Sequence, residues 1–131
     1  MTKVRSMRYV VSAMLVVVGV IHLLPLSGVL GAERLSALYG VSLSDPNLVL
    51  LMRHRAVLFG LLGSFLVFAA FNPTLQPVAL TAAFVSVLSF IWLAWPVSLH
   101  NPEVARVFAA DLLALGCLTV GTVAYLHARR G

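Results

Sequence analysis

The sequence predicts an all-α integral membrane protein: a bundle of four transmembrane helices, with a short amphipathic helix in the first outer loop. Hydrophobic residues make up 61% of the 131 residues and charged residues only 10%. The mean hydropathy of +1.03 lies far above that of a soluble domain. A spanning helix takes about 20 residues, so four spans fill the chain as a single transmembrane domain, residues 1–131.

The first predicted span covers about residues 8–24. Its apolar run, YVVSAMLVVVGVIHLL, stops at Pro25, which cannot continue a helix without losing a hydrogen bond. A basic start before an apolar run also fits a signal peptide. Leu26 and Leu30, however, stand where a cleavage site needs small residues, so we expect this segment to be retained.

The other three spans are predicted at about 46–71, 75–97 and 102–127. Each follows an Asx residue that can cap a helix and a proline suited to its first position: Asp45-Pro46, Asn72-Pro73 and Asn101-Pro102. Only a few uncharged residues separate the second and third spans, which predicts antiparallel neighbours. Trp92 and Trp95 mark an interface near the end of the third span, and Pro96 is expected to end or kink it.

A short helix is predicted within the longest connection, between the first and second spans. The stretch GAERLSALYG places Leu35, Leu38 and Tyr39 at helical spacing and ends at Gly40. Such a helix is expected to lie at the membrane surface.

The charges predict orientation and exclude one class of partner. Lys3, Arg5 and Arg8 precede the first span, Arg129 and Arg130 follow the last, and these five account for the net charge of +5. Basic flanks mark the cytoplasmic side, so we expect both termini in the cytoplasm of a bacterium and the bundle in its inner membrane. No basic stripe is present to neutralise phosphates, which argues against a nucleic-acid partner.

The sequence has a single cysteine, Cys117. It allows neither a disulfide framework nor a cysteine-based metal site within one copy of the chain.

Polar residues gather in the outer half of the predicted bundle. The run Arg53 to Arg55 lies roughly 10–14 Å along the second span, and Asp111 about 13 Å along the fourth, which enters from the same side. An arginine and an aspartate at matched depth are natural partners, because an unpaired ion in an apolar site is costly. The predicted ligand-binding residues are His22, Arg53, His54, Arg55, His100 and Asp111.

Helical phase places Arg53 on one face of the second span with Ala56, Gly60 and Gly63. A stripe of small residues predicts close packing against a neighbouring helix, so we expect Arg53 to point into the bundle. The alternative is that Arg53 and Arg55 anchor the outer interface. The apolar run 48–52, on the outer side of these arginines, argues against that alternative. A buried cluster could also serve only to hold the bundle in register.

Several functions agree with this pattern. The leading hypothesis is binding of a small anionic or lipid-derived ligand, with the arginines supplying the preference for anions and residues 35–39 acting as a lid. One alternative is a membrane-embedded enzyme that acts on a lipid or quinone-like substrate. The others are a structural or accessory subunit of a membrane complex, and transport by a dimer, which would be a homo-oligomer of this chain. Familiar catalytic motifs are absent from the sequence, which favours a binding protein. The cofactor is undetermined from the sequence; two histidines that face each other could ligate a haem, and the pair would be His22 with His54 or His100.

The stretches HLLPLSGVLGAERLSALYG and NLVLLMRHRAVLFGLLGSFL resemble small bacterial four-span proteins that are similar to the DoxX-like group. The resemblance covers most of the chain and implies a small multi-pass bundle. Proteins that look like this one are sometimes labelled phosphopantetheine adenylyltransferase, a soluble nucleotide-binding enzyme. This chain has no room for that fold and lacks its histidine-containing nucleotide motif.

Overall fold

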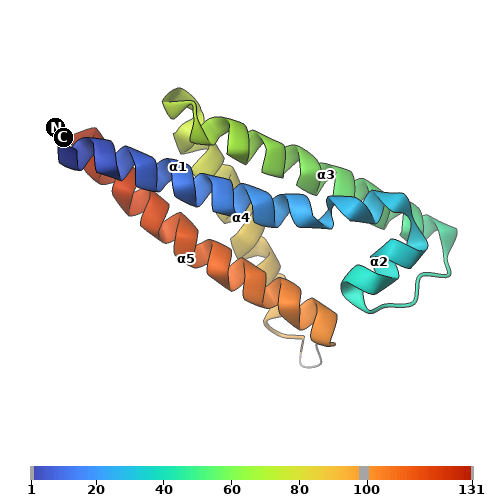
Figure 1. Cartoon of the computed structure of the whole chain (residues 1–131). Coiled ribbons are helices and arrows are strands. Elements are labelled where there is room, and N and C mark those ends of the chain that lie inside the picture. Colours follow the sequence, from blue (N-terminus) through green and yellow to red (C-terminus); the bar gives the residue numbers. More distant parts are fainter. Residues whose placement is uncertain (1, 98–100, 131) are drawn as a thin grey trace.

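The computed structural model describes residues 2–97 and 101–130, and within these residues the secondary structure is entirely helical (Figure 1). Four helices are long and apolar enough to cross a membrane: α1 (Thr2–Leu23), α3 (Pro46–Ala70), α4 (Gln76–Ala94) and α5 (Pro102–Arg130). The start of α1 and the end of α5 lie together at one end of the bundle, which we call the terminal end. The prediction of an all-α fold with four helices of spanning length is confirmed.

The helix boundaries differ from the predicted ones where proline or a basic segment intervenes. α1 begins at Thr2 rather than near residue 8, because lysine, arginine and methionine favour a helix. Its α-helical part ends at Leu23, and Leu24–Leu30 continue as a 3₁₀ helix, η1, which includes Pro25 and was not predicted. α4 ends at Ala94, close before Pro96, because proline has no backbone N–H with which to continue the helical hydrogen bonds.

Two of the three predicted Asx caps are present. The Oδ1 atom of Asp45 accepts a hydrogen bond from the backbone N–H of Asn47 (2.9 Å), and Oδ1 of Asn101 accepts one from Val104 (2.7 Å). Asn72 differs, because the short 3₁₀ helix η2 (Pro73–Leu75) separates it from α4, and its Nδ2 donates instead to the carbonyl of Phe68 (3.4 Å).

The helix α1 lies between α3 and α5 and forms the centre of the bundle. It meets α3 most closely at Gly19 and Gly63: a Cβ atom built on Gly63 would lie 2.7 Å from the carbonyl oxygen of Gly19. The predicted small-residue stripe of α3 is therefore an interface, as expected for helices that pack through small residues. The fully buried side chains of the core come from all four long helices: Val11, Leu15, Val18, Leu66, Val87 and Leu118.

Large hydrophobic side chains also cover the outside of the bundle. Exposed examples lie on every long helix, among them Val17 on α1, Leu61 on α3, Val85 on α4 and Leu113 on α5. Such a continuous apolar exterior fits a lipid solvent rather than water.

The predicted short helix is present as α2 (Ala32–Tyr39). Leu35 and Tyr39 are buried, and Gly40 ends the helix in the left-handed conformation (φ 64°), donating its N–H to the carbonyl of Ser36 at 2.8 Å. The Nδ2 atom of Asn101 donates to the carbonyls of Tyr39 (2.8 Å) and Gly40 (3.1 Å). This residue therefore both caps α5 and fastens the end of α2 to it.

Candidate functional site

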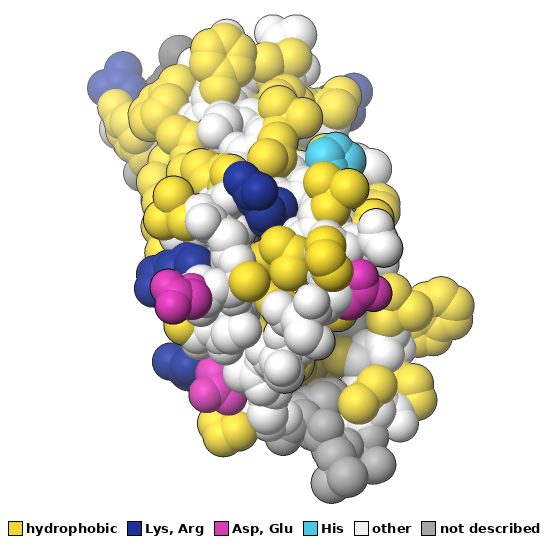
Figure 2. All heavy atoms as spheres, turned by 90° about the vertical axis from the view of Figure 1, so that its right-hand side faces the viewer, with side chains coloured by type: hydrophobic (Ala, Val, Ile, Leu, Met, Phe, Trp, Pro, Cys, Tyr) yellow, Lys and Arg dark blue, Asp and Glu magenta, His cyan; other side chains and the backbone are white. Residues whose placement is uncertain are grey.

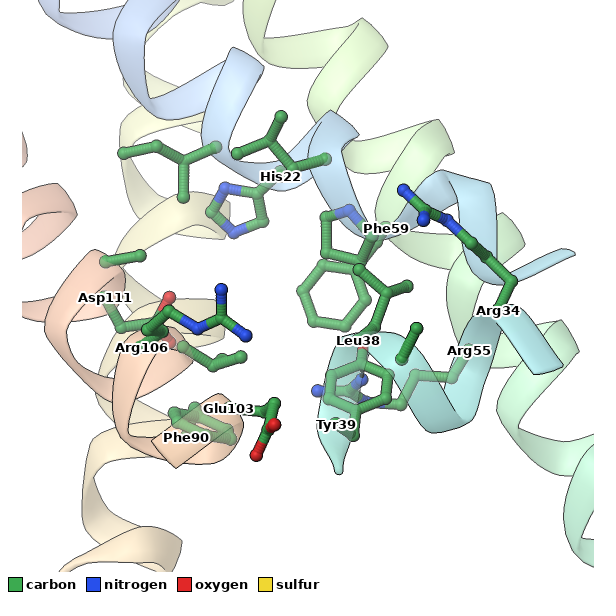
Figure 3. A pocket seen from close by; sticks show the side chains of 16 residues that line it. His22, Arg34, Leu38, Tyr39, Arg55, Phe59, Phe90, Glu103, Arg106 and Asp111 are labelled. Atoms are coloured by element: carbon green, nitrogen blue, oxygen red, sulfur yellow. Dashed lines mark hydrogen bonds between the residues drawn. The ribbon is translucent and has the colours of Figure 1, made fainter. Parts of the chain in front are cut away.

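A cavity of about 390 Å³ lies where α2 meets the bundle, away from the terminal end (Figure 3). Every helix from α1 to α5, together with η1, contributes to its wall. Figure 2 faces this end of the molecule and shows basic and acidic side chains among hydrophobic ones. The main polar and aromatic lining residues are His22, Arg34, Tyr39, Arg55, Phe59, Phe90, Glu103, Arg106 and Asp111.

Arg55 is held on one wall by two aromatic residues. Its Nη1 donates a hydrogen bond to the hydroxyl of Tyr39 (2.8 Å), and its Cζ lies 4.5 Å from the ring centroid of Phe59 and 5.3 Å from that of Tyr39. Phe59 follows Arg55 by one helical turn on α3, so the helix itself brings the two side chains together. Contact with aromatic rings orients a guanidinium group without neutralising it.

The opposite wall is the first part of α5. Figure 3 shows Glu103, Arg106 and Asp111 on this side, facing Tyr39, Arg55 and Phe59. Together with Arg34 from α2, the lining carries three arginines against two carboxylates, an excess of one positive charge. The cavity is therefore mixed in charge, with a small formal excess of positive charge.

The charged groups of the cavity do not form direct ion pairs. Over residues 2–97 and 101–130, no arginine nitrogen lies within 4.0 Å of a carboxylate oxygen. Arg55 and Asp111 face each other across the cavity without a direct ion pair. The guanidinium groups thus keep hydrogen-bond donors that no protein carboxylate occupies.

His22 closes the inner end of the cavity and is almost fully buried. Its Nδ1 lies 2.9 Å from the carbonyl oxygen of Val18, and its Nε2 lies 3.0 Å from Oγ of Ser86 on α4. Because a carbonyl can only accept, Nδ1 carries a hydrogen, and in the neutral ring Nε2 accepts from the serine hydroxyl. Both ring nitrogens are therefore engaged within the protein.

The structure brings together three of the six predicted ligand-binding residues: His22, Arg55 and Asp111. Arg53 lies outside the cavity; it is exposed, and its Nε donates to the carbonyl of Val29 in η1 (2.8 Å). The reason is rotation: residues two apart on a helix point about 200° apart, so Arg53 and Arg55 cannot share a face.

The remaining two predicted residues are histidines. His54 is exposed and does not line the cavity, and His100 falls outside the described residues. Both nitrogens of His22 are hydrogen-bonded and His54 is on the surface, so these two described histidines do not face each other as a pair of haem ligands would.

Several lining residues were not assigned to the site from the sequence. Glu103 could have been predicted, because it shares one face of α5 with Asp111: Glu103, Val107 and Asp111 follow one another at intervals of four residues. Arg106 and Phe90 carry no comparable signal, since each becomes part of the site only through the way the helices pack.

Comparisons with protein-family models, with curated proteins and with solved structures find no match to this chain. The resemblance to the DoxX-like group therefore stays a prediction.

Proposed function

We propose that this chain is a multi-pass protein of the bacterial inner membrane, with both termini in the cytoplasm, and that it binds a small anionic or lipid-derived ligand in the cavity on the outer side. The observation that carries the proposal is the pair Arg55 and Arg106. They line opposite walls of one cavity, and neither has a carboxylate oxygen within 4.0 Å among the described residues.

The orientation is supported by the distribution of charge. The five residues that give the chain its net positive charge, Lys3, Arg5, Arg8, Arg129 and Arg130, all belong to the ends of α1 and α5 that lie together. Positively charged flanks favour the cytoplasmic side, so the cavity at the opposite end would face outward.

The size and lining of the cavity support a small ligand. Ligand pockets commonly measure about 300–1,000 Å³, with mainly apolar walls and a few polar groups that fix orientation. The cavity meets this description at about 390 Å³. An arginine inside a membrane protein is costly unless it is paired, and a phosphate or carboxylate could accept two parallel hydrogen bonds from it.

Binding is better supported than histidine-based catalysis or transport. A general acid or base must reach the proton of its substrate, whereas Nε2 of His22 is directed at Oγ of Ser86 and His54 lies outside the cavity. Transport needs a polar route to the other side. The described core toward the terminal end is mainly apolar, with residues such as Leu15 and Leu66, and its buried polar residue Gln76 donates a hydrogen bond to the carbonyl of Ala70.

The experiment is a thermal-unfolding titration of the purified protein in an uncharged maltoside detergent, with butyl phosphate as the probe and butanol as the neutral comparison. Arg55→Gln is expected to weaken butyl phosphate binding by roughly 10–100-fold, because a hydrogen bond to a charged group contributes about 1.5–3 kcal/mol. Arg53→Gln removes the same charge two residues away and outside the cavity, so it is the matched control.

The proposal is supported if Arg53→Gln still binds butyl phosphate and Arg55→Gln does not. Equal behaviour of the two variants, or equal stabilisation by butanol, would remove its basis.

A further inference from the structure

A second cavity of about 330 Å³ adjoins the first. Four residues line both cavities: Tyr39, Arg55, Phe90 and Val107. The other residues of the second cavity come from the loop after α2, the first turns of α3 and the start of α5: Val41, Ser42, Leu43, Leu48, Met52 and Val104.

The two cavities differ in chemistry. Among the residues that the structure describes, the first is lined by three arginines and two carboxylates, whereas Arg55 is the only ionisable lining residue of the second apart from the phenol of Tyr39. Because Arg55 lies on the boundary, its guanidinium is placed where a charged region of a ligand would meet an apolar one.

We propose that the ligand is a single-chain amphiphile, an inference that rests on the proposed function. Its anionic head group lies in the first cavity between Arg55 and Arg106, and its hydrocarbon chain passes Tyr39 and Phe90 into the second cavity. Charge and hydrophobicity together select this class, because a fully polar anion would leave the second cavity unused and a neutral hydrocarbon would leave the arginines unpaired.

The volume of the second cavity limits the chain. A protein cavity of about 150 Å³ holds one benzene molecule, so a volume twice as large takes on the order of ten carbon atoms. One medium-length chain fits, whereas the two long chains of a membrane phospholipid do not.

The second cavity also reaches an apolar part of the surface. Val41 and Leu48, which line it, are 39% and 42% exposed. This surface would face the outer leaflet in the proposed orientation, so an amphiphile from the leaflet can enter along an apolar path.

The test compares butyl phosphate with decyl phosphate, titrated against wild type, Met52→Gln and Val104→Phe in maltoside detergent. Both substitutions alter the second cavity alone: the first places an amide against the chain, and the second fills part of the volume. Decyl phosphate also partitions into micelles, but that partitioning is the same for every variant and cancels when variants are compared at one chain length.

Each substitution is expected to weaken decyl phosphate binding by about tenfold, because an unpaired polar group or a lost space opposes burial of the chain. Butyl phosphate, which has no need of the second cavity, is expected to bind all three proteins alike. Unfolding temperatures without ligand show whether each variant is folded, and either variant is sufficient for the comparison.

Unchanged decyl phosphate binding in both variants, with butyl phosphate still dependent on Arg55, overturns the single-chain assignment and leaves the proposed function standing. If both probes bind Arg55→Gln and Arg106→Gln as tightly as wild type, the proposed function itself is overturned.

A third arm of the experiment adds dioleoyl phosphatidic acid, a two-chain lipid. Displacement of decyl phosphate by this lipid, mole for mole, would also overturn the assignment, and weak displacement supports it.

Discussion

Replacing Gly63 with alanine is expected to force α1 and α3 apart. The new Cβ would lie 2.7 Å from the carbonyl oxygen of Gly19, 2.8 Å from Cγ of Leu23 and 3.0 Å from the backbone nitrogen of Leu23. Real Cβ atoms essentially never approach other heavy atoms closer than 3.0 Å. Two of the three atoms belong to the backbone, so no side-chain rotation relieves the contact and the helices themselves must move.

The size of the effect follows from two opposing contributions. Overpacking a tight interface costs about 1–3 kcal/mol, and opening a gap of 0.5–1 Å forfeits roughly a quarter to a half of the dispersion attraction across it. Against this, alanine is favoured over glycine inside a helix by up to about 1 kcal/mol. Gly116→Ala is the matched control, because a Cβ there meets no atom within 4 Å. The helix preference is common to both variants and cancels, so Gly63→Ala should be less stable than Gly116→Ala by about 2–3 kcal/mol.

The measurement is reversible unfolding in mixed maltoside and dodecyl sulfate micelles, followed by tryptophan fluorescence. Gly19→Ala should act in the same direction, because its Cβ would lie 3.0 Å from the carbonyl oxygen of Gly63. If Gly63→Ala proved as stable as Gly116→Ala, the close approach of α1 and α3 would be refuted.

Three further changes test other parts of the structure. Gly40→Ala puts a side chain at φ 64° and directs its Cβ into the carboxylate of Glu103, so stability should fall by about 1–3 kcal/mol in the same unfolding assay. Ser86→Ala leaves Nε2 of buried His22 without its partner, which should cost about 1–3 kcal/mol; an unchanged unfolding curve would contradict that hydrogen bond. Thr122→Val removes a buried hydroxyl that has no hydrogen-bond partner, so the variant should be as stable as wild type or more stable, and a loss above about 1 kcal/mol would mean that the hydroxyl is bonded after all.

The sequence predicted the position of the arginines along α3 but not which of them would line the cavity. The cluster Arg53 to Arg55 was found because charges within an apolar segment are rare, and its depth along α3 follows from the rise per residue. Helical phase assigned Arg53 to the small-residue face, yet that face is filled by contacts with α1 and η1, and Arg53 reaches only the edge of η1. Arg55, on the other side of the helix, meets Tyr39 because α2 folds back there.

The sequence by itself determined the helices. Apolar composition, the Asx-Pro caps at Asp45 and Asn101 and the stop at Gly40 act within a few residues of chain, so a local pattern suffices to predict them. The basic flanks were likewise read from position along the chain, and the orientation that they predict stays a prediction.

Only the tertiary structure decided which side chains share a cavity. Each helix lies with its small residues packed closely against a neighbour, and this arrangement places Arg55 and Asp111 on opposite walls of one cavity while leaving His54 outside it. The second cavity depends further on how the loop after α2 crosses the starts of α3 and α5. Such an arrangement is a property of several segments at once, because the free energy of packing belongs to the contact between helices and not to either helix alone.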